Sequence, residues 1–173
     1  MKVLLTGIAG SGKTSAVNAL RAQGYNAIDL DDSDVCAWVN KQTGEQTDYV
    51  AGAGKEWIEN HRWQVIPTRL LEALSSFAED VDVFVGGKIA RTQAREIANI
   101  FDVVYLLKPP NSIVDERLRT RTTNIRNFGR EREERDYIVK NRNDFERACE
   151  RVGAIPLENR GSIEELLDAI LRK

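Results

Sequence analysis

Short apolar runs alternate with amphipathic stretches along the whole chain. The apolar runs have the length of buried β-strands and lie at 3–5, 25–28, 81–85, 103–107 and 154–157. Apolar residues at helical spacing fill the stretches between and after these runs, at 13–23, 56–77, 92–100, from 112 onward, 131–152 and 162–171. Five strands that alternate with helices predict a three-layer α/β fold, in which helices cover both faces of a five-stranded parallel sheet.

Some helix boundaries carry their own sequence signals. Ser162 followed by Glu165 predicts a capping box at the start of the last helix, and Ser112 begins a similar pattern. Pro67 lies inside the stretch 56–77, so we expect two helices or one kinked helix there.

Length and charge exclude several classes of protein. A chain of 173 residues fits a single domain, 1–173, and a formal net charge of −2 provides no general attraction to nucleic acid or to anionic membranes. The N-terminal apolar run is too short for a signal peptide or a membrane span. Cys36 and Cys149 are far apart and have no metal-ligand spacing, which favours a reduced protein. We therefore expect a cytoplasmic monomer or homodimer.

A phosphate-binding loop follows the first strand. Residues 7–14 read GIAGSGKT and match the pattern G-x-x-x-x-G-K-[ST]. Glycines let backbone N–H groups turn inward around a phosphate, and the helix that begins at Lys13 adds its positive N-terminal end. Lys13 is expected to reach the β- and γ-phosphates of ATP, and the Thr14 hydroxyl to ligate Mg²⁺. The predicted nucleotide-binding residues here are Gly7, Ala9, Gly10, Ser11, Gly12, Lys13, Thr14 and Ser15.

With this loop, the chain resembles a small P-loop kinase of the shikimate, gluconate and adenylate kinase superfamily. The resemblance runs the whole length and is strongest at the loop. It implies a five-stranded parallel sheet with a mobile lid. It also implies transfer of the γ-phosphoryl group of ATP to a small acceptor.

Four carboxylates, Asp29, Asp31, Asp32 and Asp34, lie within six residues after the second strand. Ligands bind beyond the carboxyl ends of parallel strands, so this cluster should face the phosphate-binding loop. Mg²⁺ would offset the repulsion among the carboxylates. The resemblance to shikimate kinase implies that Asp29 faces the metal and that Asp31 receives the acceptor hydroxyl. Asp32 competes for the second role, and a solvated, helix-capping turn is the alternative for each residue.

An arginine-rich segment without acidic residues lies at 117–130. Its arginines are Arg117, Arg119, Arg121, Arg126 and Arg130. Arginine forks suit phosphate oxygens, and helical spacing places Arg117 and Arg121 on one face. The segment looks like a lid in which Arg117 and Arg121 contact the nucleotide, while Arg121 and Arg126 stabilise the transition state. The alternatives are an RNA-binding patch and surface ion pairs.

The segment 38–66 is the expected acceptor-binding insertion, because the superfamily has one after its second strand. It contains Arg62 and several aromatic residues, which could form a pocket for a sugar or a base. Ordinary helix packing is the alternative. Gly86 and Gly87 end the third strand, where exposed backbone can approach the acceptor. Lys88 follows and could bind an anionic acceptor.

Two more arginines are candidates through the resemblance alone. Arg142 stands three residues before Phe145, as an acceptor-binding arginine of shikimate kinase stands before an aromatic residue. Arg160 follows the last strand, where the superfamily encloses the adenine. The third strand has no aspartate at its end, which departs from the usual Walker B form and assigns metal binding to the second strand.

The favoured function is that of an ATP-dependent, Mg²⁺-requiring kinase that phosphorylates a hydroxyl-bearing metabolite. A nucleoside monophosphate kinase is the second reading, and a nucleotide-binding protein or slow NTPase without an acceptor is the third. A polynucleotide 5′-kinase is a fourth reading, which the net charge disfavours. The identity of the acceptor stays open.

Overall fold

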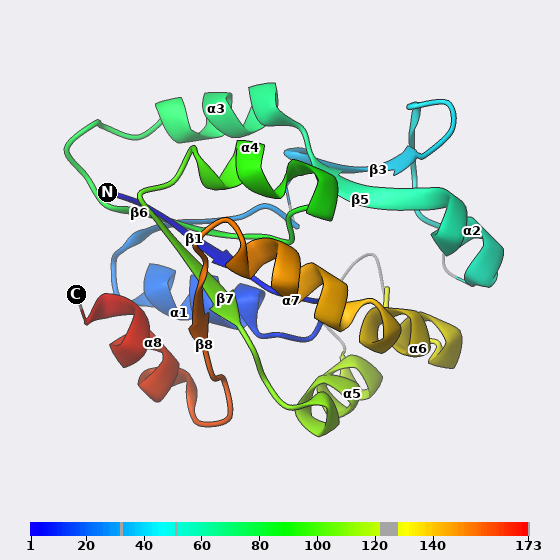
Figure 1. Ribbon diagram of the computed structural model, residues 1–173. Coiled ribbons are helices and arrows are strands. Elements are labelled where there is room, and N and C mark those ends of the chain that lie inside the picture. Colours follow the sequence, from blue (N-terminus) through cyan, green and yellow to red (C-terminus); the bar gives the residue numbers. More distant parts are fainter. Residues whose placement is uncertain (32, 51, 122–127, 173) are drawn as a thin grey trace.

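A five-stranded sheet forms the centre of the computed structural model, which describes residues 1–31, 33–50, 52–121 and 128–172 (Figure 1). The strand order is β2-β6-β1-β7-β8, and all neighbours are parallel. The strands are β1 (Lys2–Thr6), β2 (Asn26–Asp29), β6 (Val83–Gly86), β7 (Val103–Leu107) and β8 (Ile155–Leu157). This confirms the predicted α/β fold and brings the carboxyl ends of all five strands to one edge.

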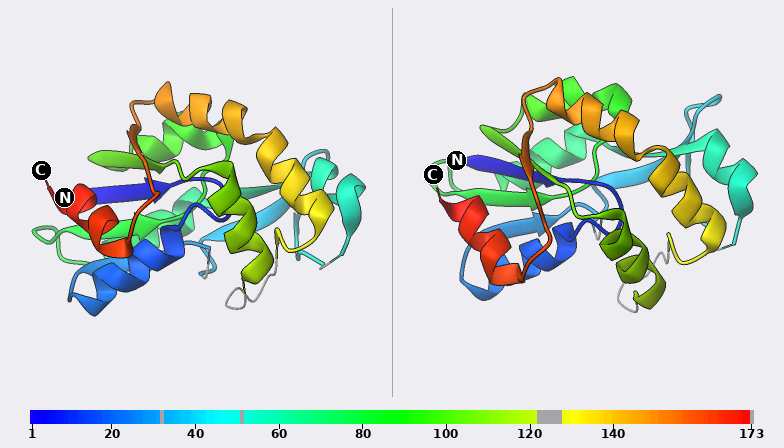
Figure 2. Two further views of the ribbon diagram at one scale, coloured as in Figure 1. Left: turned by 90° about the horizontal axis from the view of Figure 1, so that it is seen from below. Right: turned by 60° about the horizontal axis from the view of Figure 1, so that its bottom comes forward.

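Helices cover both faces of this sheet, as Figures 1 and 2 show. Successive side chains of β1 point to opposite faces of the sheet, which explains the two layers of helices. Val3 and Leu5 pack in a cluster with α1 (Lys13–Ala22) and α8 (Ile163–Leu171), whereas Leu4 belongs to the cluster on the opposite face. That second cluster contains side chains of α3 (Pro67–Ser75), α4 (Ala94–Ala98), α5 (Asn111–Thr120), α6 (Arg132–Lys140) and α7 (Arg142–Glu150).

A second, three-stranded antiparallel sheet corrects the expectation of two helices or one kinked helix over 56–77, because a strand separates the two helices there. Its order is β4 (Gln46–Thr47), β3 (Cys36–Asn40) and β5 (His61–Val65), with α2 (Gly54–Asn60) before β5. Five residues of β5 pair with β3, so ladder hydrogen bonds outweigh the local helical spacing. Ile66 is extended, as expected before proline, and Pro67 then begins α3.

Two other helix predictions need correction, and one is confirmed. The predicted helix 131–152 is divided into α6 and α7 at Asn141, whose side chain donates a hydrogen bond to the Tyr137 carbonyl (2.8 Å). α5 begins one residue before Ser112, next to Pro110, without a side-chain cap. A short 3₁₀ helix, η1 (Arg91–Gln93), precedes α4. The capping box formed by Ser162 and Glu165 is present at α8.

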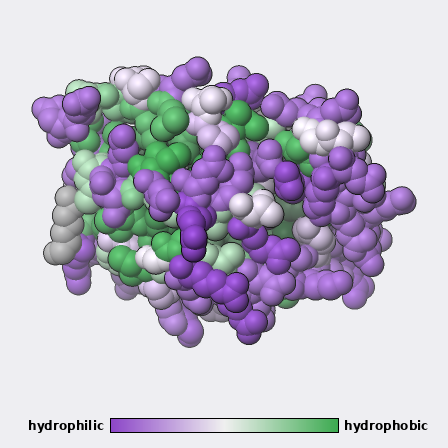
Figure 3. Space-filling model, turned by 45° about the horizontal axis from the view of Figure 1, so that its top comes forward, coloured by the Kyte–Doolittle hydropathy of each residue, from purple (hydrophilic) through white to green (hydrophobic). Residues whose placement is uncertain are grey.

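The outer surface differs between the two halves of the molecule. With the side of α3 turned forward, apolar side chains reach the surface mainly in the half over the large sheet, whereas the half that holds α2 and α6 is mostly hydrophilic (Figure 3). Along α6, the exposed side chains include Arg132, Glu133, Asp136 and Lys140. No helix within the described ranges is long and apolar enough to cross a membrane.

The buried carboxylate of Glu134 joins three separate segments in this hydrophilic half. Only 2% of Glu134 is exposed. It accepts hydrogen bonds from the hydroxyl of Tyr49 and from the backbone N–H groups of Gly129 (2.6 Å) and Glu131 (3.4 Å). The segment 38–66, the end of the arginine segment and α6 therefore share one buried hydrogen-bond acceptor.

Replacing Glu134 by alanine is expected to lower the free energy of unfolding by about 2–3 kcal/mol, since three donors lose their acceptor in a buried place. Urea unfolding would measure this loss. Glu133→Ala on the exposed side of the same helix is the matched control and should stay within about 0.5 kcal/mol of wild type. Equal effects of the two variants would contradict the structural role of Glu134.

Candidate active site

The phosphate-binding loop connects β1 to α1 at the carboxyl edge of the large sheet. Gly10 and Gly12 have φ angles of 79° and 98°, which are unfavourable for residues with a side chain. A Cβ atom on Gly12 would also lie 2.6 Å from Nδ2 of Asn159. This amide donates a 2.8 Å hydrogen bond to the Ser11 carbonyl, so the segment after β8 helps to hold the loop in its conformation.

Lys13 folds back over the loop that precedes it. It is 5% exposed, and its Nζ donates hydrogen bonds to the carbonyls of Gly7 and Ile8, both at 3.2 Å. The same Nζ lies 3.7 Å from Oδ2 of Asp31. The ammonium is thus held between the loop and the end of β2, where a bound phosphate would meet it.

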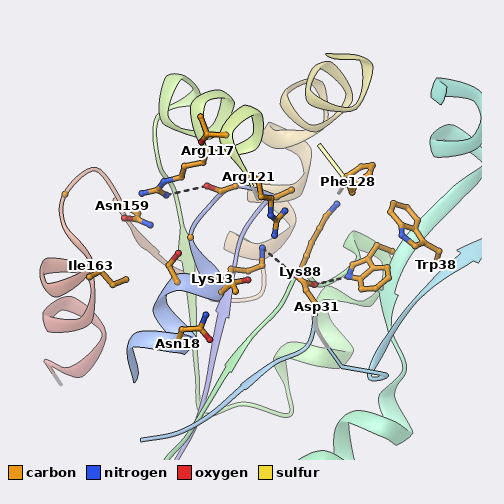
Figure 4. Close-up of a pocket in the computed structure, with 18 residues that line it drawn as sticks. Lys13, Asn18, Asp31, Trp38, Lys88, Arg117, Arg121, Phe128, Asn159 and Ile163 are labelled. Atoms are coloured by element: carbon orange, nitrogen blue, oxygen red, sulfur yellow. Dashed lines mark hydrogen bonds and ion pairs between the residues drawn. The ribbon is translucent and has the colours of Figure 1, made fainter. Parts of the chain in front are cut away.

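Asp31 is positioned by donors from two elements (Figure 4). Its Oδ1 accepts a 3.0 Å hydrogen bond from the indole Nε1–H of Trp63 on β5, while Oδ2 faces Lys13. The Asp31 side chain is 21% exposed and lines the cavity described below. A carboxylate with one oxygen anchored and the other beside the phosphate-binding lysine has the geometry of an oriented general base.

Asp29 has the properties of a metal ligand. It is 3% exposed, and its Oδ1 accepts a hydrogen bond from the backbone N–H of Asp31 (2.9 Å). Within the described part of the chain, its Oδ2 is buried without a hydrogen-bond partner. Burial, together with the charge of Asp31, raises the pKa of Asp29, and the nearby Thr14 hydroxyl opposes the rise. An unsatisfied carboxylate oxygen next to a hydroxyl fits Mg²⁺, which takes oxygen ligands.

A cavity of about 690 Å³ extends from the loop to the second sheet. At one end it is lined by loop residues, Arg117 and Asn159. At the other end it is lined by Trp38, Trp63 and Phe128. Asp31 and Lys88 also line it, and Figure 4 shows both near Lys13. The cavity therefore offers a phosphate-binding end and an aromatic end on either side of one carboxylate.

The arginine segment contributes two side chains to this cavity. Arg117 and Arg121 line it, and Arg117 donates a 3.4 Å hydrogen bond to the Gly10 carbonyl. Burial lowers the pKa of Arg117. Arg119 pairs instead with Asp115 outside the cavity. The predicted residues Arg126 and Asp32 lie outside the described residues, as does most of the predicted lid.

Three predicted arginines have partners elsewhere in the structure. Nε of Arg62 donates to Gln64 at 2.7 Å. Arg142 pairs with Glu146 at 2.6 Å and donates a second hydrogen bond to Asn111, and Arg160 pairs with Glu158 at 2.7 Å. None of these arginines is among the described residues that line the cavity. Their assignment to acceptor or nucleotide stays a prediction.

Gly86 and Gly87 allow close packing of neighbouring elements at the end of β6. A Cβ atom on Gly86 would lie 2.5 Å from Val17 of α1, and one on Gly87 would lie 2.8 Å from Leu30. These glycines let α1 and the end of β2 approach the sheet. Among the described residues, the cavity lining includes neither glycine, so their role toward an acceptor is untested.

Some cavity residues carried only a weak sequence signal. Trp38 lies at the centre of an aromatic cluster, with its ring centroid between 5.1 and 6.0 Å from those of Tyr49, Trp57, Trp63 and Phe128. The density of aromatic residues in 38–66 pointed to such a cluster. The participation of Phe128, Asn159 and Asn18 depends on contacts between distant segments, which local patterns do not reveal.

Several solved structures of kinases have a fold similar to that of this chain. A shikimate kinase from Acinetobacter baumannii in complex with shikimate has 20% identity and a TM-score of 0.62, over 99% of this chain and 90% of that chain. A shikimate kinase from Aquifex aeolicus has 18% identity and a TM-score of 0.55, over 99% and 94%. The deoxyadenosine kinase from M. mycoides with bound dATP has 10% identity and a TM-score of 0.53, over 99% and 97%.

In sequence, no family model matches the chain, and a search of curated proteins finds no significant match. At these low identities the structural likeness concerns the fold. The phosphate-binding loop, the strand order and nearly complete coverage agree on one conclusion. The chain has the fold of the P-loop kinases, as its resemblance to the shikimate kinase superfamily implied.

Proposed function

We propose that this protein is an ATP-dependent kinase that transfers the γ-phosphoryl group to a hydroxyl of a small metabolite. The observation that carries the proposal is the placement of Asp31, which is anchored by Trp63, faces Lys13 and lines the cavity between its two ends. A carboxylate in that place can accept the proton of a hydroxyl bound next to the γ-phosphate.

The nucleotide occupies the loop end of the cavity in this proposal. Backbone N–H groups of the loop and the N-terminus of α1 bind the phosphates, and Lys13 reaches the β- and γ-phosphates. Arg117 and Arg121 contact the nucleotide from α5 and the residue after it. Thr14 and Asp29 would hold Mg²⁺, which would neutralise part of the phosphate charge.

Transfer then requires one proton acceptor and several cations. The acceptor oxygen forms a bond to the γ-phosphorus as the bond to the β,γ-bridging oxygen breaks, and the hydroxyl proton passes to Asp31. Lys13 and Arg121 stabilise the charge that develops on the transferred group, with Arg126 in the same proposed lid, 117–130. ADP and the phosphorylated metabolite leave.

The acceptor occupies the aromatic end, which makes 38–66 the proposed acceptor-binding segment. Trp38 and Trp63 come from this segment and form one wall of the cavity. Aromatic walls hold the apolar faces of sugars and rings, and they also stack on bases. A nucleoside monophosphate kinase is therefore the second candidate, which this aromatic wall supports.

An acceptor screen tests the proposal. Purified protein, ATP and Mg²⁺ would be incubated with sugars, hydroxy acids, nucleosides and nucleoside monophosphates, and ADP formation and phosphorylated product would be measured. Formation of a phosphorylated product from a hydroxyl compound, together with an equal amount of ADP, would support the kinase proposal. ATP hydrolysis that no acceptor stimulates would favour the slow NTPase instead.

Trp63→Phe is expected to lower kcat by about tenfold or more while changing the acceptor KM only a few-fold. Phenylalanine keeps an aromatic ring in the cavity wall but cannot donate to Asp31, so the base loses its anchor. The measurement is steady-state kinetics with the best acceptor from the screen. Trp57→Phe is the matched control, since Trp57 stacks on His61 and is not among the described cavity residues. An increase in KM alone would show that the ring matters and the N–H group does not.

A further inference from the structure

A lysine outside the phosphate-binding loop points into the same cavity. Lys88 follows β6 and the two glycines, and its half-buried side chain reaches the cavity beside Asp31 (Figure 4). Its Nζ lies 5.9 Å from the centroid of the Phe145 ring. The ammonium therefore lies near an aromatic ring, while Lys88 lines the cavity that an acceptor would occupy.

Lys88 differs from the other lysines near the site, because no close anionic partner for it lies among the described residues. Lys13 is bonded to two loop carbonyls and faces Asp31, and Lys108 pairs with Glu146 (3.2 Å) and Glu150 (2.8 Å). For Lys88, the described residues provide no hydrogen bond and no ion pair within 4.0 Å. A half-buried charge without a partner is unfavourable unless a ligand completes its surroundings.

The electrostatic surroundings of Lys88 are unfavourable to its charge on balance. Burial is the main cause that lowers the pKa of Lys88, to about 8, and the positive charges of Lys13 and Arg91 act in the same direction. Asp31 and Cys149 act in the opposite direction, but less than burial and Lys13 together. A bound anion would add countercharge to that of Asp31.

The acceptor-binding arginines that the family resemblance implies do not fill this role. Arg142 is held by Glu146 and Asn111, and Arg62 donates to Gln64. Neither is among the described residues that line the cavity, whereas Lys88 is. Besides Lys13, which faces the proposed base, the cavity therefore receives a lysine from the segment after β6, which is a different segment from those of the two arginines.

We propose that Lys88 is the specificity-determining residue for the acceptor and that it binds an anionic group of that molecule, a carboxylate or a phosphate. This inference rests on the proposed kinase function. Asp31 receives the hydroxyl proton, Trp38 and Trp63 hold the carbon frame, and Lys88 binds the anionic group. The lysine ammonium is a compact charge, unlike the planar guanidinium group of arginine. It can therefore bind either a carboxylate or a phosphate group.

A labelling experiment tests the anion site without knowledge of the acceptor. Pyridoxal 5′-phosphate, an anionic aromatic aldehyde, would be added at pH 8 to protein saturated with Mg²⁺ and a non-hydrolysable ATP analogue. The neutral amine of Lys88 attacks the aldehyde carbon, water leaves, and borohydride reduces the imine to a stable secondary amine. Peptide mapping then gives the rate at each lysine.

Lys88 should be labelled at least about tenfold faster than Lys108, which is also half-buried but whose two carboxylate partners raise its pKa. Inorganic sulfate should slow labelling at Lys88, because it competes for the anion site. Labelling of Lys88 at or below the rate of Lys108, or no protection by sulfate, would overturn the proposal.

A second experiment compares matched acceptors in the transfer assay. Each anionic acceptor, a hydroxy acid or a sugar phosphate, would be paired with a neutral analogue, the amide or the free sugar. The wild type should prefer the anionic member, and Lys88→Met should raise its KM roughly tenfold to hundredfold with a much smaller change in kcat. Lys88→Arg keeps the positive charge and should restore part of this affinity.

The outcomes separate the two proposals. Preference for neutral acceptors would refute the role of Lys88 while the kinase function stands. Rapid, sulfate-sensitive labelling without transfer to any acceptor would refute the kinase function while the anion site stands. A Lys88→Met variant that binds and turns over acceptors like wild type would refute the specificity role directly.

The thermal stability of the Lys88→Met variant gives a further test, which does not depend on enzymatic activity. Lys88→Met should raise Tm, because it removes a half-buried charge that has no close anionic partner among the described residues. The folded pKa of about 8 lies below the ordinary value of 10.5, so the cost of the charge is fully present below pH 8 and fades as the pH rises toward 10.5. The gain in Tm should shrink over that range. A loss of Tm at pH 7 would show that the ammonium has a stabilising partner within the protein, contrary to the proposal.

Discussion

Replacing Lys13 by alanine is expected to lower phosphoryl transfer by at least about a thousandfold while leaving the protein folded. Lys13 is held by two loop carbonyls and faces Asp31, so its charge is positioned before the nucleotide binds. Lys13 is the one lysine within residues 7–22, which form the loop and α1. The alanine variant therefore has no lysine in these two elements that could replace the charge. Turnover would be measured with ATP, Mg²⁺ and the best acceptor, and folding by circular dichroism.

Lys108→Ala is the control for a lysine that belongs to a salt-bridge cluster outside the cavity. It should keep nearly full turnover. If Lys13→Ala also kept full activity, the assignment of the loop to catalysis would be wrong. If it unfolded, the milder variant Lys13→Met would separate loss of charge from loss of packing, because methionine keeps most of the buried stem.

Asp31→Asn is expected to lower kcat by about a hundredfold to ten-thousandfold, while the affinity for ATP changes little. Asparagine keeps the shape of the side chain, and its oxygen can still accept the hydrogen bond from Trp63. It cannot take up the acceptor proton. The measurements are single-turnover kinetics for the transfer step and calorimetric titration with a non-hydrolysable ATP analogue.

Asp34→Asn is the matched control, because Asp34 belongs to the same acidic cluster but is exposed and does not line the cavity among the described residues. Its kcat should remain near that of wild type. A loss of nucleotide binding in Asp31→Asn without a specific loss of kcat would place Asp31 in the nucleotide site rather than at the acceptor hydroxyl.

The candidate site shows which parts of such a protein are predictable from sequence. The loop residues 7–14 were identifiable because phosphate binding needs glycine backbone, lysine and a hydroxyl at fixed spacing in a continuous segment. Asp31 was identifiable only together with Asp32, because a strand end is uncertain by one residue. The structure brings Asp31 against Lys13 and Trp63, which local patterns do not specify.

The strand β5 shows why part of the fold escaped prediction. Residues 61–65 lie between two helices and have no helix-breaking residue before Pro67, so their spacing favoured helix. In the structure they pair with β3, which is more than twenty residues earlier in the chain. This pairing turns Trp63 toward Asp31 and the cavity, so the aromatic end of the site depends on a contact between distant strands.

The sequence by itself determined the parallel α/β core and the phosphate-binding loop, because alternating apolar runs and a contiguous motif are local properties of the chain. Only the tertiary structure decided which cations and aromatic rings share the cavity. Arg62 and Arg142 find partners elsewhere, while Lys88 reaches the site from the segment after β6 and Trp38 reaches it from β3. Side-chain direction and long-range pairing set that choice, and neither is encoded in the spacing of residues within one segment.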